Sequence, residues 1–170
     1  ASRVCAGITT YSPLRHWNVG PGSKVAVAGL GGLGHMGVKL AHAMGAEVTV
    51  LTRSAAKAGE AKALGAHHVL LASDTDSIKR ATGTFDFVLD TIPVVHELDP
   101  YLRLVRTHGA LVLVGVIDTI PAFSSRLLIG GRKSLSGSAI GGIAETQELL
   151  DFCAAKGVAA DCEMTTMPRI

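Results

Sequence analysis

The chain has 170 residues, of which 48% are apolar and 18% are charged, and its formal net charge is +2. This length and apolar content suit one domain with a sizeable buried core. The small charge and sparse aromatic residues exclude a nucleic-acid surface, and the apolar runs are far shorter than a bilayer span, so no membrane attachment is expected. The cysteines, Cys5, Cys153 and Cys162, lack C-x-x-C spacing, which favours a reducing cytoplasm over a disulfide framework.

Apolar runs alternate with helical patterns along the chain. Strands are expected at residues 24–28, 47–51, 68–71, 85–90, 110–116 and 133–136, and helices at the start of the chain and at residues 36–44, 55–64, 100–105 and 144–155. Asp99 is expected to cap the helix at 100–105, with Pro100 at its first position. This alternation predicts an α/β fold with a doubly wound parallel six-stranded sheet in three layers. Ligand sites then lie at the carboxyl ends of the strands.

A glycine-rich turn joins the first expected strand to the helix that follows it. The turn consists of Gly29, Leu30, Gly31, Gly32, Leu33 and Gly34. Gly29 permits the tight turn, Gly31 lets the backbone approach phosphates, and Gly34 lets the helix pack close to its strand. Free N–H groups at the amino end of the helix complete a pyrophosphate cradle. The turn therefore predicts a dinucleotide-binding Rossmann fold, although a glycine-rich turn by itself can also be purely structural.

The residues after the second strand predict which dinucleotide binds. NAD-binding versions of this fold place an acidic side chain there to hold the ribose 2′-hydroxyl, whereas this chain has Thr52, closely followed by Arg53, Ser54 and Lys57. These cations and hydroxyls can donate charge-assisted hydrogen bonds to a 2′-phosphate, which a carboxylate would repel. The expected cofactor is NADP(H). The alternative is a solvated Arg and Lys at the start of a surface helix.

Four ordered motifs resemble those of the cinnamyl alcohol dehydrogenase group of zinc-dependent medium-chain dehydrogenases. They lie at residues 5–14 (CAGITTYSPL), 29–37 (GLGGLGHMG), 90–93 (DTIP) and 137–141 (GSAIG), so the resemblance covers nearly the whole chain. It implies reversible hydride transfer between NADP(H) and an alcohol or aldehyde, with a catalytic zinc polarising the substrate oxygen. It also implies a homodimer formed through the edge of the sheet at residues 132–140.

The resemblance implies roles for further residues. Cys5 matches a catalytic zinc ligand, Thr9 a residue beside the nicotinamide, and Thr91 a contact near a ribose. The backbone that holds the carboxamide is matched by Val114, Gly115, Val116, Ser138, Ala139 and Ile140. Ala139 stands where plant members commonly carry a bulky aromatic residue beside the substrate. The substrate pocket is therefore expected to be wider or less aromatic.

The other ligands of the catalytic zinc belong, in the resembling family, to a separate domain that precedes this segment. We therefore interpret residues 1–170 as the NADP-binding domain of a larger two-domain enzyme, inactive by itself. A non-catalytic NADPH-binding or sensing module is the alternative. A methyltransferase-like domain shares the glycine-rich turn, but Thr52 and the neighbouring cations suit a phosphate better than a cationic sulfonium ligand. Cys153 is expected to pack within its helix, and Cys162 is also expected to be structural.

Overall fold

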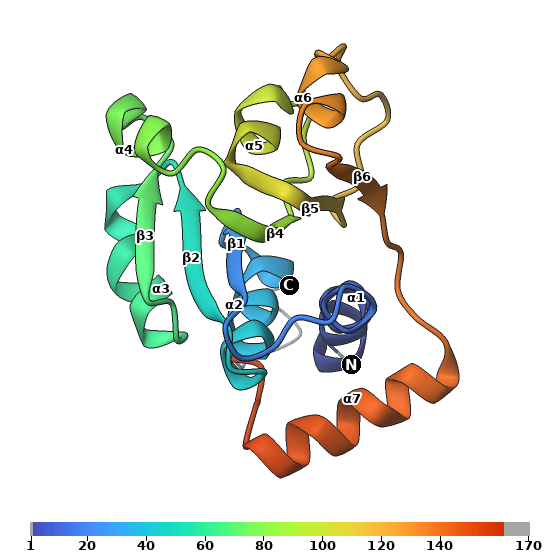
Figure 1. Ribbon diagram of the computed structural model, residues 1–170. Helices are drawn as coiled ribbons and strands as arrows, with labels where there is room; N and C mark the ends of the chain where they lie inside the picture. Colours follow the sequence, from blue (N-terminus) through green and yellow to red (C-terminus); the bar gives the residue numbers. More distant parts are fainter. Residues whose placement is uncertain (1, 162–170) are drawn as a thin grey trace, which may run out of the picture.

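The structure is a computed structural model that describes residues 2–161. Its centre is a 6-stranded sheet with only parallel pairings, in the order β3-β2-β1-β4-β5-β6 (Figure 1). The strands are β1 (Lys24–Ala28), β2 (Glu47–Thr52), β3 (His68–Leu71), β4 (Phe85–Asp90), β5 (Val105–Leu113) and β6 (Ser134–Gly137). The strand order reverses between β1 and β4, which is where sheets of this kind bind ligands. The predicted doubly wound α/β fold is confirmed.

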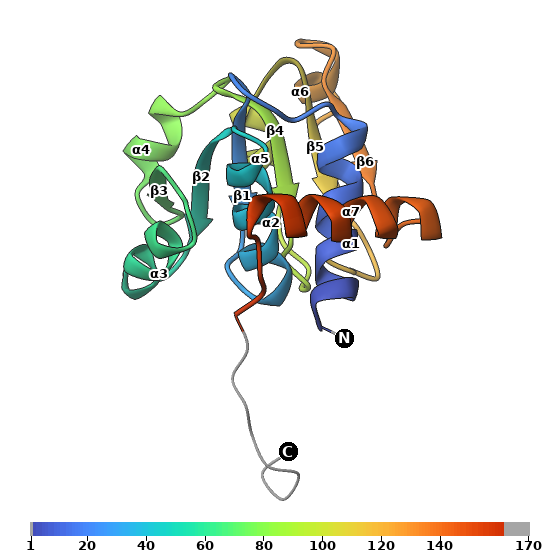
Figure 2. The same ribbon diagram turned by 90° about the horizontal axis from the view of Figure 1, so that it is seen from below.

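Helices cover both faces of the sheet (Figure 1 and Figure 2). One face carries α1 (Ser2–His16), α2 (Gly32–Ala43), α3 (Ala58–Ala63) and α7 (Ile143–Lys156), and the other carries α4 (Thr75–Arg80), α5 (Asp99–Leu104) and α6 (Arg126–Ile129). Because successive strand residues point to opposite faces, Val25 and Val27 of β1 join one hydrophobic cluster while Ala26 and Ala28 join the other. No helix within residues 2–161 combines the length and the apolarity that crossing a membrane requires.

Several elements differ in extent from the sequence-based expectation. β5 begins at Val105, not at residue 110, because Val105 pairs with Phe85 and a register shift carries the exposed residues 106–108 past β4. It ends at Leu113, before the expected residue 116. α2 begins at Gly32 instead of residue 36, and the helix expected at 55–64 is a 3₁₀ turn, η1 (Ala55–Lys57), followed by α3. Because β5 ends at Leu113, the residues after it are in loop conformation at the carboxyl end of the sheet.

The expected cap of α5 is wrong. Leu98 stands in the cap position, and Asp99 is the first residue of the helix. The Asp99 carboxylate instead accepts a hydrogen bond from the Ser124 N–H at 3.1 Å. The segment that follows β5 therefore folds back beside α5 and supplies a donor that the local sequence does not reveal.

Candidate cofactor site

The glycine-rich turn connects β1 to α2, and its geometry requires glycine at two positions. Gly29 has a φ of +90°, in the left-handed region, and a Cβ there would lie 2.8 Å from Thr91 Oγ1. A Cβ at Gly34 would overlap the carbonyl oxygen of Gly29. Gly31 and Gly32 are exposed instead, and a Cβ at either would meet nothing within 4 Å. The turn therefore has no space for a side chain at Gly29 or Gly34, whereas its backbone is accessible at Gly31, as a bound pyrophosphate requires.

The amino end of α2 supplies donors for an anion. Gly31 stands in the cap position without a side chain to accept from the helix, and the first turn contains no acidic residue. The first N–H groups of a helix have no partner inside the helix, and its dipole favours negative charge there. Leu30 is 6% exposed and packs into the core, with Leu33 partly buried against the same cluster, so the turn is held in place. This end of α2 fits a phosphate group.

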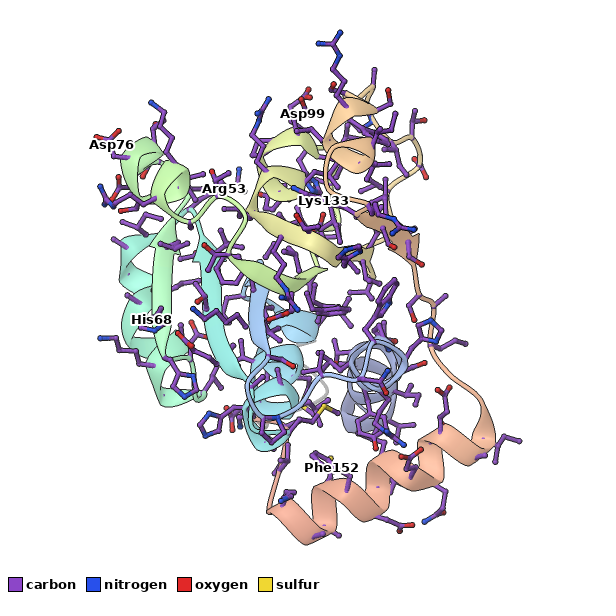
Figure 3. All side chains as sticks on the ribbon, in the orientation of Figure 1. Arg53, His68, Asp76, Asp99, Lys133 and Phe152 are labelled. Carbon is purple, nitrogen blue, oxygen red and sulfur yellow. The ribbon has the colours of Figure 1, made fainter. Side chains whose placement is uncertain are left out.

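The residues predicted to hold a 2′-phosphate lie beside the glycine-rich turn. Thr52 ends β2 and is 8% exposed, and its Oγ1 accepts a hydrogen bond from the Ser54 N–H at 3.2 Å. Arg53 is exposed, on the side of β2 that faces α5 (Figure 3). Lys57 Nζ donates a hydrogen bond to the Leu30 carbonyl oxygen at 2.7 Å. This contact ties the predicted phosphate cluster directly to the glycine-rich turn.

The end of β4 also closes against the glycine-rich turn. Thr91 follows β4 and is 7% exposed, and its Oγ1 donates a hydrogen bond to the Ala28 carbonyl oxygen at 2.8 Å. Gly115, after β5, approaches the Ile92 backbone so closely that a Cβ there would overlap the Ile92 carbonyl oxygen. Thr91 and Gly115 therefore hold neighbouring strand ends together at the edge where the cofactor is expected.

The residues predicted to contact the carboxamide follow β5 and β6. Val114 is 6% exposed, whereas Val116 is 84% exposed. The Ser138 N–H donates to the Leu113 carbonyl oxygen at 3.0 Å and so extends the pairing of β6 with β5. Ala139 and Ile140 beyond it are exposed. The structure therefore brings the predicted residues from β1, β2, β4, β5 and β6 to the same carboxyl edge of the sheet.

Sequence reasoning missed a polar pair at the end of β4. Asp90 is 1% exposed, and it accepts a hydrogen bond from the Ile92 N–H at 3.0 Å and contacts His96 Nε2 at 2.8 Å. The Tyr101 ring of α5 lies edge-on to the His96 ring, with centroids 5.3 Å apart. Burial raises the pKa of Asp90, against the lowering influence of the Ile92 N–H and of His96. The only sequence signal was an acidic residue that ends a buried strand, with a histidine in the loop after it.

Comparison with known proteins identifies the family. A family model described as zinc-binding dehydrogenase matches residues 32–155. The chain belongs to the zinc-binding dehydrogenase family. It is 52% identical over 172 residues to a protein of Escherichia coli named aldehyde reductase YahK, covering 100% of this chain and 49% of that protein. It is 51% identical over 169 residues to NADP-dependent alcohol dehydrogenase C 1 of Mycolicibacterium smegmatis, covering 98% of this chain and 48% of the relative.

Solved structures of the same family share the fold. A cinnamyl alcohol dehydrogenase of Sorghum bicolor superposes with a TM-score of 0.95 at 39% identity, over 98% of this chain and 48% of the other. A cinnamyl alcohol dehydrogenase of Helicobacter pylori, solved in complex with NADP(H), gives 0.82 at 43% identity, over 92% of this chain and 45% of the other. This zinc-binding dehydrogenase chain thus spans about half the length of the relatives that it matches.

The zinc ligand expected in this dehydrogenase chain lies on α1. Cys5 is exposed, and Figure 2 places the amino end of α1 at the end of the sheet toward which β4 and β5 point. Thr9, one turn further along α1, is 7% exposed. Within residues 2–161, no group of three or more His, Cys, Asp or Glu side chains is arranged to hold a metal ion. These residues therefore do not fit a complete zinc site, and Cys5 can contribute only one ligand to it.

The other two cysteines, Cys153 and Cys162, were both expected to be structural, and the structure describes only the first of them. Cys153 of α7 is partly buried against the hydrophobic cluster that includes α1 and α2, which confirms the expectation that it packs. Cys162 lies outside the residues that the structure describes.

Proposed function

We propose that this chain is the NADP(H)-binding domain of an alcohol dehydrogenase or aldehyde reductase that transfers hydride between NADP(H) and an alcohol or aldehyde. One observation carries the cofactor assignment. The second strand ends in Thr52 instead of a carboxylate, and one of the two cations after it, Lys57, reaches the glycine-rich turn by donating to the Leu30 carbonyl oxygen. The names of the Escherichia coli and Mycolicibacterium smegmatis relatives support the same cofactor and reaction class.

In this proposal the chain binds and orients the dinucleotide, and the rest of a larger two-domain enzyme completes the zinc site. Cys5 supplies one thiolate ligand. The expected residues after β5 and β6 hold the carboxamide through their backbone, because the N–H and carbonyl groups of such loops can match its acceptor and donor. We expect the isolated chain to bind the cofactor without turning over substrate.

Titration of the chain with NADPH, NADH and S-adenosylmethionine tests this function. We expect NADPH to bind most tightly, because only NADPH carries the 2′-phosphate that the Arg53 and Lys57 cations attract. Isothermal calorimetry at one pH and one ionic strength is the measurement. Preference for S-adenosylmethionine would favour a methyltransferase-like domain. Aldehyde reduction and zinc content of the complete gene product would separate the enzyme from a non-catalytic NADPH sensor, which would show neither.

We also infer a homodimer in the cytoplasm. Among residues 2–161, β6 pairs in the sheet only with β5, so its other edge offers backbone groups without a partner in this range to a second copy along residues 132–140. The three cysteines without C-x-x-C spacing favour a reducing compartment. Sedimentation velocity at increasing concentration should show a dimer of the chain. A strictly monomeric chain at the highest concentration would contradict the edge-to-edge assembly.

A further inference from the structure

The contacts of His96 require one proton more than a neutral imidazole and a carboxylate would carry. His96 Nδ1 lies 2.7 Å from the Val94 carbonyl oxygen, and Nε2 lies 2.8 Å from Asp90 Oδ2. A carbonyl oxygen only accepts, so Nδ1 carries a hydrogen. In a neutral ring, Nε2 would then turn a lone pair toward the carboxylate. One further proton must therefore lie between Nε2 and Oδ2.

With this proton in place, the pair of Asp90 and His96 has no net charge, whichever of the two groups holds the proton. Without it, the pair has a charge of −1 and two lone pairs face each other in a buried position. Tyr101 faces the pair from α5, and burial together with the Asp90 charge raises the pKa of Tyr101. The positive charge of Arg53, which follows β2, lowers the pKa of Tyr101. The neighbouring Glu97 is exposed.

The pair of Asp90 and His96 also holds the loop of residues 92–96, which borders the proposed cofactor site. One carboxylate oxygen of Asp90 accepts from the Ile92 N–H, and the other holds His96, so both ends of the segment 92–96 are bound to one buried side chain. Between these attachments, Val94 and Val95 are 55% and 61% exposed. A Cβ added to Gly29, which begins the glycine-rich turn, would contact the Ile92 side chain, so Ile92 lies directly beside this turn. The position of the loop therefore affects the wall of the dinucleotide site.

We propose that His96 is a positioning residue for the dinucleotide, which holds segment 92–96 beside the glycine-rich turn through a proton shared with Asp90. This inference rests on the proposed NADP(H) function. When the proton leaves, the loop loses one attachment and a negative charge arises beside an anionic ligand. Binding of the dinucleotide and retention of the proton therefore stabilise each other, so affinity falls as the pH rises through the loss of this proton.

The dissociation constants of NADPH and NADH, measured by calorimetry across the whole pH range in which wild type and His96→Gln both stay folded, test the proposal. A glutamine amide can reach the Nε2 position and donate to Asp90, but it does not titrate. In wild type we expect affinity for both dinucleotides to fall over this range by about tenfold more than in His96→Gln, a coupling of ordinary size. NADH lacks a 2′-phosphate, so its profile excludes titration of that group as the cause.

Two further variants keep the test decisive. His96→Leu removes the donor and should bind both dinucleotides weakly at every pH, with thermal unfolding used to show that the chain is folded. His68→Gln is the matched control, because His68 pairs with Glu47 at 3.1 Å at the start of β3, away from Arg53 (Figure 3). It should keep the wild-type pH profile. Equal profiles for wild type and His96→Gln would overturn this inference while NADPH binding stands, whereas a wild-type chain that binds no NADPH at pH 7 would overturn the proposed function as well.

Discussion

Alanine at both Arg53 and Lys57 is expected to weaken NADPH binding about a hundredfold, which corresponds to about 3 kcal/mol. Charge-assisted hydrogen bonds contribute roughly 1.5 to 3 kcal/mol each, so the loss of two such donors to the 2′-phosphate accounts for this size. NADH lacks that group and should lose much less. Calorimetric titration of the double variant with both dinucleotides is the measurement.

The two single variants should differ, because the two cations have different contacts. Arg53 is exposed and bound to no part of the glycine-rich turn that the structure describes, so Arg53→Ala should affect NADPH selectively. Lys57 holds the Leu30 carbonyl oxygen at 2.7 Å, so Lys57→Ala should also loosen the turn and weaken NADH. Lys62→Ala removes the same charge from an exposed position of α3 and serves as the control. An equal loss for NADPH and NADH in Arg53→Ala would refute the 2′-phosphate assignment.

Substitution of Gly34 by alanine should destabilise the chain by roughly 1 to 3 kcal/mol, the usual cost of forcing an extra carbon into a packed site. The new Cβ would overlap the Gly29 carbonyl oxygen, which is backbone and cannot rotate away. Either α2 must move from β1 or the turn must open, and each disrupts the phosphate cradle. Thermal unfolding should therefore show a midpoint lower by several degrees, and NADPH binding should be strongly reduced.

Gly32→Ala is the matched control for this effect. Gly32 lies two residues away in the same turn of α2, is exposed, and has open space where a Cβ would stand. Alanine is also the better helix former, so the unfolding midpoint should be unchanged or raised. If Gly34→Ala unfolded at the wild-type temperature, the close approach of α2 to the turn would not be a constraint on this fold.

β1, β2 and β4 could be predicted closely because nearly all of their residues are buried on both faces of the sheet. In β1 each residue from Val25 to Ala28 is fully buried, so a continuous apolar run marks the strand. β5 was less visible, since its first half contains the exposed Arg106, Thr107 and His108, whose pairing depends on a register shift against β4. The short helices α4 and α6 have no apolar periodicity. Neither helix was predicted, and the cap of α4, where the Asp74 side chain accepts from the Ser77 N–H at 3.0 Å, is seen only in the structure.

The local chemistry of the candidate site was determined by the sequence alone. The glycines at positions 29 and 34 and the missing carboxylate at Thr52 are properties of single residues within a strand–turn–helix unit, so they can be recognised without knowing which distant segments pack against them. The family resemblance rested on motifs of the same local kind.

How these parts are held together depends on contacts between segments that are separated along the chain. The hydrogen bond from Lys57 to Leu30, the contact of Asp99 with Ser124 and the proton shared by Asp90 and His96 each join groups whose meeting no sequence period dictates. Such contacts depend on where loops cross the carboxyl edge of the sheet. The order of the strands and the packing of the two hydrophobic clusters set those crossings, because a buried polar group must find a partner among whichever segments the packed core brings beside it.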